Sequence, residues 1–424
     1  MLINKLGMLL LGGGMKQLAA LCLLGALASF LISGATIWFA QRHKLGIDQS
    51  SGLQRLHRSQ VPRLGGIPIF LAFFLVGIYA FRAQAGTLQQ AFALGLLTLP
   101  VLVVGLFEDF TGRASVTLRF LITVLCAAAA AVSYGMTLRS VAFGPLDIVI
   151  GSSALAAVAF STFAIAGMPH AINIIDGCNG LAGSTATAAL GGLGVVASVV
   201  GDWNIAQACW LATGTVVGFM LWNFPFGKIF LGDAGAYVIG FLIAELAVLL
   251  LIRNPGVSPW FPLLLVIYPV WETLFSMWRR SSIALAQVVR PDSRHLHQVV
   301  YRFVSTRLLG FHLQNRRMVA SSLASIPFGL WAVFSTLFAT RFYDNTLALK
   351  LCCLSFAVVY AILYRGLEIR RRSGQDPKVA MRKMREIRRR GRPARSGVDP
   401  GGAIDAAASG AFFKESTCVF RDAP

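Results

Sequence analysis

Long apolar stretches constrain this chain more than any other feature of its sequence. A sliding window of about 20 residues, the length of helix that crosses a bilayer, finds about eleven of them. Hydrophobic residues make up 56% of the chain and charged residues only 13%, against about 25% charged in an ordinary globular domain. Soluble cores cannot bury so much apolar surface, so lipid must solvate most of it. We therefore predict an all-α, polytopic integral membrane bundle of about 11 transmembrane helices.

The predicted spans differ in how they would meet lipid. The sixth is rich in Ala and Gly, which indicates close packing between helices rather than contact with lipid. In chain order the spans lie near residues 17–40, 65–82, 91–107, 117–135, 151–169, 180–200, 206–224, 235–252, 260–278, 318–341 and 347–364.

The net charge of +20 would suggest a nucleic-acid partner in a soluble protein, but here its distribution favours another explanation. Lys and Arg concentrate in residues 42–63, 279–317 and 365–395. Basic loops of membrane proteins stay on the cytoplasmic side. Placing the first block there predicts an N-terminus outside, and eleven crossings then bring the C-terminus inside with the third block. No nucleic-acid partner is expected.

Two regions follow from this distribution. Residues 1–364 hold all predicted spans and form the expected transmembrane catalytic domain, whereas residues 365–424 form a basic tail that is expected to be disordered. The tail is predicted to lie on the anionic inner leaflet, although a purely topogenic role would explain its charge as well. Alternation of the spans places five loops at the cytoplasmic face: 41–64, 108–116, 170–179, 225–233 and 279–317.

Acidic residues are rare, eighteen in all, and several lie where a span meets a cytoplasmic loop. Glu108 and Asp109 end the third span, Asp176 follows the fifth, and Asp233 precedes the eighth. Ionisable groups at that depth are costly unless they face a polar cavity or a cation. Carboxylate oxygens brought together in this way suit Mg²⁺, which shares its coordination with waters and substrate phosphates.

The segment from Asn173 to Gly183 is the most specific motif in the chain. Asn173 and Asp176 are three residues apart, so a last helical turn would place them on one side. Gly177 and Gly180 permit tight turns beside a ligand. The alternative is a helix C-cap followed by an ordinary loop.

Asp233 lies between two glycines at the start of the eighth span. It could simply be the N-cap of that helix. A helix N-terminus also favours phosphate, however, and the glycines allow close approach of the backbone. Together with the other acids, Asp233 is a candidate metal ligand.

Two basic loops carry candidate phosphate ligands. In an extended segment His295 and His297 would point to one side and Arg294 to the other, an arrangement that complements a diphosphate. His57 and Arg58 in the first loop would hold a lipid-linked phosphate at the membrane surface. A solvated, topogenic loop is the alternative in both cases.

Two further acids, Glu245 and Glu272, lie inside predicted spans. Glu272 is about two turns before Arg279 and would pair with it or lie beneath the site, whereas Glu245 has no evident partner. Neither is assigned a catalytic role.

These blocks, in this order, resemble the polyprenyl-phosphate N-acetylhexosamine-1-phosphate transferase superfamily, which includes the phospho-MurNAc-pentapeptide translocase. The resemblance covers roughly residues 55–302 and rests on five blocks. They are His57-Arg58 with Pro62 to Gly66, the acidic pair Glu108-Asp109, Asn173 to Leu181, Gly232 to Gly235, and His295-Leu-His297. Glu108 stands where the family usually has Asp, His170 where many members have Asn, and Gln298 where a further histidine occurs.

The resemblance implies transfer of an N-acetylhexosamine 1-phosphate from a UDP-sugar to undecaprenyl phosphate, with release of UMP, in the bacterial inner membrane. It favours the branch that initiates O-antigen or exopolysaccharide synthesis, and it leaves a homodimer open. The implied roles are catalysis for Glu108, Asp109 and Asp176, metal binding for Asp233 and Asn173, nucleotide binding for Gly177, Asn179 and Leu181, diphosphate or sugar binding for Arg294, His295 and His297, and lipid-phosphate binding for His57 and Arg58.

Two other classes of function compete with a transferase. A secondary transporter would place its coupling acids near the bilayer midplane on broken helices, whereas these acids lie at helix ends. A non-catalytic membrane anchor would explain the basic tail but not the acidic blocks. Within the transferase class, a covalent phospho-aspartyl intermediate competes with direct displacement.

Overall fold

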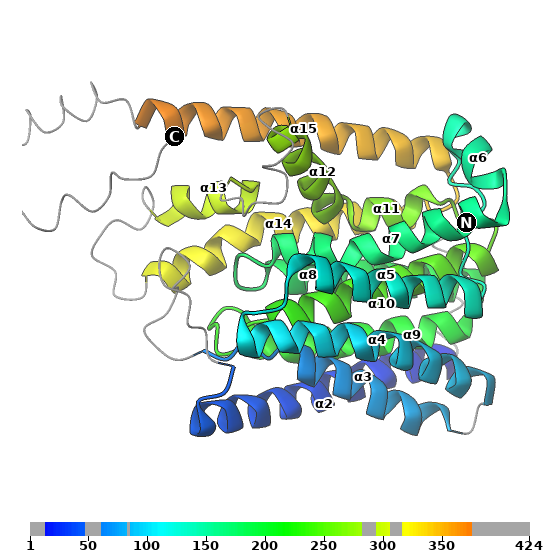
Figure 1. Ribbon diagram of the computed structural model, residues 1–424, viewed down its shortest axis with the longest axis horizontal. Coiled ribbons are helices and arrows are strands. Elements are labelled where there is room, and N and C mark those ends of the chain that lie inside the picture. Colours follow the sequence, from blue (N-terminus) through cyan, green and yellow to red (C-terminus); the bar gives the residue numbers. More distant parts are fainter. Residues whose placement is uncertain (1–12, 47–60, 83–84, 282–293, 306–315, 375–424) are drawn as a thin grey trace, which may run out of the picture. The chain divides into compact units, whose positions relative to one another are not determined.

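The computed structural model describes residues 13–46, 61–82, 85–281, 294–305 and 316–374, and these ranges are helical apart from their connections (Figure 1). Contacts group residues 1–368 into one unit and residues 369–424 into another. The helices are α2 (Gly13–His43), α3 (Gly66–Phe81), α4 (Ala85–Thr111), α5 (Val116–Ser133), α6 (Gly144–Gly151), α7 (Ala154–Ile175), α8 (Leu181–Val200), α9 (Trp203–Asn223), α10 (Gly232–Arg253), α11 (Trp260–Leu265), α12 (Ile267–Ser281), α13 (Leu296–Phe303), α14 (Arg316–Arg341) and α15 (Thr346–Gly374).

Helix α10 forms the centre of the bundle and contacts α3, α4, α7, α8 and α9. Its apolar window is 94% buried within the protein, against 22% for α15, whose surface is left for lipid. Helix α8, the Ala- and Gly-rich sixth span, is 67% buried, as its composition predicts.

Nine helices in the described part of the chain are long and apolar enough to cross a membrane: α2, α4, α5, α7, α8, α9, α10, α14 and α15. The predicted polytopic helical class is thus confirmed, but two of the eleven predicted segments differ. The segment near 65–82 is α3, an apolar helix of only 16 residues.

The segment near 260–278 is not one continuous helix. It divides at Val266 into α11 and α12. Pro269 accounts for the break, because its nitrogen cannot donate a hydrogen bond to Leu265 and its ring crowds that carbonyl. The second half, α12, carries Glu272 on its buried side.

Several helices end close together because they approach α10 without intervening side chains. A Cβ added to Gly66 of α3 would lie 2.7 Å from the Ala234 carbonyl carbon, and one on Gly105 of α4 would meet the same residue. Only glycine permits such an approach. Helix α7 also runs six residues past the predicted end of its span, so residues 170–175 of the predicted loop are helical.

Candidate active site

Asp109, at the end of α4, holds the first turn of α10. Its Oδ1 accepts the backbone N–H of Asp233 at 2.9 Å, and its Oδ2 accepts that of Ala234 at 2.9 Å. These donors would otherwise be unsatisfied, as at any helix N-terminus. The Asp109 side chain is fully buried. Asp109 therefore caps α10, the role that the sequence left open for Asp233.

Its neighbour Glu108 contacts the segment that follows α4 rather than α10. Glu108 Oε2 accepts the backbone N–H of Ala114 at 2.8 Å and so closes the turn between α4 and α5. The two members of the acidic pair thus hold two different segments, and only Asp109 reaches α10.

Asp233 projects from the first turn of α10 between two guanidinium groups. Arg119 of α5 donates to its Oδ2, and Arg63 Nη2 lies 3.5 Å from its Oδ1. Arg63 also lies 3.7 Å from Asp109, measured from Nε to Oδ1. The preceding Gly232 has a φ of +72°, a conformation that favours glycine, and this turns the helix start towards α4.

Arg63 reaches the cluster because its segment pairs with the loop before α10. The backbone N–H of Phe230 donates to Pro62 at 2.9 Å, and that of Gly65 donates back to Phe230 at 3.0 Å. The first and fourth predicted cytoplasmic loops therefore lie side by side.

Asp176 joins the same cluster from the end of α7. It follows the last helical residue, and its carboxylate accepts the backbone N–H of Gly232. Burial raises the pKa of Asp176 well above its usual value; Arg63 opposes this, whereas Asp233 and Asp109 raise it further. Three carboxylates from three helix ends thus share one region.

Asn173 lies one turn before Asp176, as their spacing predicts. Its side chain hydrogen-bonds the Tyr237 hydroxyl, which also contacts Arg119. Tyr237 is fully buried one turn along α10 from Asp233. The four predicted residues Asp109, Asn173, Asp176 and Asp233 are therefore brought together.

The residues of this cluster fit Mg²⁺ by their chemistry. The donors are carboxylate and amide oxygens, and a divalent cation bound among them would offset the burial and the charges of Asp233 and Asp109 that raise the pKa of Asp176. Among the described residues, no group of three or more His, Cys, Asp and Glu is arranged to hold a metal by itself. An ion that takes most of its ligands from water and substrate phosphates needs only one or two protein carboxylates.

The turn after Asp176 is built around main-chain hydrogen bonds. The N–H of Asn179 donates to Ser321 Oγ at 2.9 Å, and that of Gly180 donates to Asn223 Oδ1 at 2.8 Å. Asn179 is buried, and its Nδ2 has no hydrogen-bond partner among the described residues. Leu181 begins α8 with its side chain wholly inside the core, so it anchors this turn through packing.

His297 lies against the same turn from α13. A Cβ added to Gly177 would be 2.5 Å from His297 Nε2, which is why this position is glycine. The segment is not extended as predicted, because α13 begins at Leu296, but the His295 and His297 rings still lie side by side, parallel within 3° and with centroids 5.6 Å apart. Arg294 is exposed beside them.

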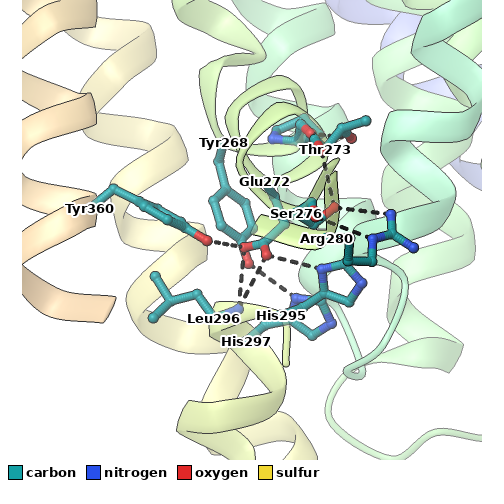
Figure 2. A network of polar contacts seen from close by, with 10 residues as sticks. Tyr268, Glu272, Thr273, Ser276, Arg280, His295, Leu296, His297 and Tyr360 are labelled. Atoms are coloured by element: carbon teal, nitrogen blue, oxygen red, sulfur yellow. Dashed lines mark hydrogen bonds and ion pairs between the residues drawn. The ribbon is translucent and has the colours of Figure 1, made fainter. Parts of the chain in front are cut away.

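Glu272 of α12 holds the ring of His295 (Figure 2). Its carboxylate contacts His295 at 3.0 Å and Tyr360 of α15 at 2.9 Å. Glu245, by contrast, lies wholly buried on α10, where Thr98 of α4 donates to it at 3.4 Å.

Sequence reasoning did not include Arg63, Arg119, Tyr237, Glu272 or Tyr360 in the site. A signal existed for Arg119, since it is a charge within the apolar span near 117–135. Arg63 lies in the block from Pro62 to Gly66, but the sequence did not mark it as a site residue. Nothing in the sequence marks either tyrosine. The predicted residues His57 and Arg58 lie outside the described residues.

The fold and cluster define a polytopic helical membrane protein with a buried acidic site at one end of its bundle. Residues 91–251 match the family model described as glycosyl transferase family 4. This match covers the central part of the chain and agrees with the superfamily that its motifs resemble.

The chain is also similar to curated proteins, of which three are described here. A probable undecaprenyl-phosphate N-acetylglucosaminyl 1-phosphate transferase of Bacillus subtilis is 29% identical over 65% of this chain and 73% of its own length. The undecaprenyl-phosphate alpha-N-acetylglucosaminyl 1-phosphate transferase of Yersinia pestis is 28% identical over 64% of this chain and 75% of its own length. A phospho-N-acetylmuramoyl-pentapeptide-transferase of Geobacillus kaustophilus is 28% identical over 53% of this chain and 72% of its own length.

Proposed function

We propose that this protein transfers an N-acetylhexosamine 1-phosphate from a UDP-sugar to undecaprenyl phosphate and releases UMP. The observation that carries the proposal is the convergence of Asp109, Asp176 and Asp233 with two arginines at one end of the bundle. The named relatives support it, because they are undecaprenyl-phosphate N-acetylglucosaminyl 1-phosphate transferases.

The reaction exchanges one phosphoanhydride bond for another. A phosphate oxygen of the lipid attacks the phosphorus that carries the sugar, and a new P–O–P linkage forms. The bond from that phosphorus to the oxygen of the uridine-bearing phosphate breaks, and UMP leaves with the electron pair. The attacking oxygen is already anionic, so positioning matters more than removal of a proton.

Asp233 and Asn173 would hold Mg²⁺, which when bound would neutralise charge on the diphosphate. Arg63 and Arg119 flank Asp233 and present guanidinium groups that complement phosphate oxygens. Asp109 fixes Asp233 by capping α10, so its proposed catalytic role is one of positioning. Glu108 holds the α4–α5 turn and contributes in the same indirect way.

The remaining predicted residues divide between the two substrates. Gly177 and Asn179 form a turn suited to the nucleotide, with His295, His297 and Arg294 on the diphosphate or sugar. His57 and Arg58 are proposed to hold the lipid phosphate.

Direct displacement is favoured over a phospho-aspartyl intermediate at Asp109. Both oxygens of Asp109 accept backbone N–H groups, and attack by either would break the cap of α10. Failure to trap an acyl phosphate during single turnover is the expected outcome. A chemically trapped acyl phosphate would establish the covalent route instead.

Incubation of membranes with radiolabelled UDP-N-acetylglucosamine and undecaprenyl phosphate tests the proposal. We expect release of UMP and a labelled lipid diphosphate, and loss of both when EDTA removes divalent cations. A protein that instead accumulates labelled substrate across sealed vesicles, with no UMP release, would be a transporter. Replacing the labelled donor by other UDP-N-acetylhexosamines identifies the sugar.

A product of this kind begins assembly of a surface glycan on a lipid carrier. We therefore propose that the protein acts in the bacterial inner membrane at the first membrane step of O-antigen, exopolysaccharide or related glycan synthesis. The test is loss of the glycan when the chromosomal copy carries Asp233→Asn. An unchanged glycan would exclude this assignment.

A further inference from the structure

Glu272 gathers hydrogen-bond donors from two neighbouring elements (Figure 2). The Tyr360 hydroxyl of α15 donates to Oε2 at 2.9 Å, and His295 Nδ1 lies 3.0 Å from Oε1. The backbone N–H of Leu296, the first residue of α13, lies 3.3 Å from both oxygens. The side chain is only 1% exposed, so these groups replace water as its partners.

These contacts fix both the start of α13 and the ring of His295. His295 precedes α13 but makes no side-chain cap of its own, so the Glu272 carboxylate satisfies the first N–H instead. A carboxylate only accepts hydrogen bonds, so His295 Nδ1 must carry a proton. In neutral imidazole this leaves His295 Nε2 as an acceptor.

His297 has the opposite arrangement. The Tyr268 hydroxyl accepts the backbone N–H of His297 and lies 3.1 Å from its Nδ1. Among the described residues His297 Nδ1 is the one acceptor within hydrogen-bond distance of that hydroxyl, so we assign the hydroxyl proton to this contact and Nδ1 as its acceptor. Burial lowers the pKa of His297 to about 3, so its ring is neutral. The remaining proton must therefore be on Nε2.

His297 Nε2 has no partner among the described residues, although the side chain is 0% exposed. It lies against the turn at Gly177, where a single added carbon would meet it. Asn179 Nδ2, another buried donor without a partner in the described structure, belongs to the same turn. A buried N–H without an acceptor is costly unless a ligand supplies one.

We propose that Glu272 and Tyr268 are positioning residues that set His295 and His297 in opposite tautomers, so that His297 Nε2–H is offered to an acceptor oxygen of the sugar nucleotide. Tyr360 supports Glu272 from α15. The identity of the ligand rests on the proposed function, whereas the tautomers rest on the hydrogen bonds and on the burial of His297.

Substitutions at Glu272 separate this role from a general contribution to folding. In Glu272→Gln the amide oxygen still accepts from His295 and Leu296, and the Tyr360 hydroxyl turns to accept the amide N–H. Glu272→Ala removes every one of these bonds. Glu245→Gln is the matched control, because Glu245 is also fully buried in the membrane region but contacts Thr98 rather than the histidines.

Steady-state kinetics of the purified full-length protein with both substrates give the first readout. Glu272→Ala should raise KM for the UDP-sugar about tenfold, the effect of roughly one lost hydrogen bond, with little change in KM for undecaprenyl phosphate. Glu272→Gln should recover most of that loss, Tyr268→Phe should raise the same KM, and Glu245→Gln should leave both values unchanged. Equal effects on both KM values, or no recovery in Glu272→Gln, would overturn the proposal.

Nitrogen-15 NMR of histidine-labelled protein gives a readout that needs no turnover. We expect the proton of His295 on Nδ1 and that of His297 on Nε2, with loss of the His297 preference in Tyr268→Phe; comparison with His297→Gln assigns the signals. The same tautomer in both histidines would refute the inference even if the enzyme is active. Absence of UMP release by the wild-type protein, with opposite tautomers still observed, would refute the proposed function instead.

Discussion

Asp109 shows how one carboxylate can shape a candidate site through hydrogen bonds to the backbone. Both of its oxygens are committed to the backbone of α10, and this fixes the direction in which Asp233 leaves the helix. A carboxylate at a helix N-terminus also interacts favourably with the helix dipole. The acidic motif thus contributes geometry through Asp109 and charge through Asp233.

Asp109→Asn should therefore lower both stability and turnover. Asn offers one acceptor oxygen where the cap uses two, and the amide N–H₂ would face a backbone donor, at a cost of about 1–3 kcal/mol. Thermal unfolding in detergent and UMP release measure the two effects. Asp202→Asn is the control, because Asp202 caps α9 through Ile205 but lies outside the cluster. It should lose stability and keep turnover; equal loss of turnover in both variants would contradict a local role for Asp109.

Gly177→Ala tests the contact between the Gly177 turn and His297. The added Cβ would lie 2.5 Å from His297 Nε2, so the turn or the ring must move. We expect turnover to fall about 10²-fold, as for other small displacements of positioned groups. Gly167→Ala, where the structure places nothing within 4 Å of the new carbon, should behave as the wild type. Normal kinetics in Gly177→Ala would show that the turn can move away from His297 without affecting turnover.

At the level of elements, the site depends on how closely α4 can approach α10. Helix–helix packing in membranes relies on small residues that let backbones come together. Gly105 provides this approach one turn before Asp109, and Gly66 of α3 does so at the Ala234 carbonyl carbon. Helix packing and catalytic geometry are therefore coupled through the same short stretch of α10.

Gly105→Ala should separate α4 from α10. The new methyl group would meet the Ala234 backbone, and such overpacking typically costs about 1–3 kcal/mol. We expect a lower unfolding temperature together with reduced UMP release, because Asp109 moves with α4. Gly191→Ala in α8, with open space around the added carbon, is the control. An unchanged unfolding temperature in Gly105→Ala would show that the interface can relax.

For the whole molecule, every described contact of the site lies between Arg63 and Tyr360. A chain that ends at Gly374 should therefore retain most of its turnover. Membrane assays of the deletion of residues 375–424 test this, with the full chain as the reference. Loss of turnover at normal expression would assign the basic tail a part in catalysis, and loss of expression would assign it a part in insertion.

The predicted orientation in the membrane is a property of the whole molecule. The described segments of all five predicted cytoplasmic loops meet at the clustered helix ends, through Arg63, Glu108, Asp176, Asp233 and His297. Reporter fusions should place the N-terminus outside and the C-terminus inside. A C-terminal reporter active outside the membrane would invert the topology and separate the site from cytoplasmic UDP-sugars.

Much of the architecture was available from the sequence because its causes are local. A bilayer of fixed thickness requires apolar helices of a certain length, and lipid cannot satisfy backbone groups left unpaired. Motif spacing likewise placed Asn173 and Asp176 on one turn and drew attention to Asp109 and Asp233. The break at Val266 was also within reach, since Pro269 interrupts an otherwise continuous apolar run.

The tertiary structure alone decided which group does what, because those choices depend on partners far away in the chain. Asp109 rather than Asp233 caps α10, through bonds that span 124 and 125 residues. Tyr360 reaches Glu272 across 88 residues. A carboxylate looks the same in a sequence whether it binds a cation, ends a helix or holds a histidine. Only the donors that the fold brings within about 3 Å distinguish these roles.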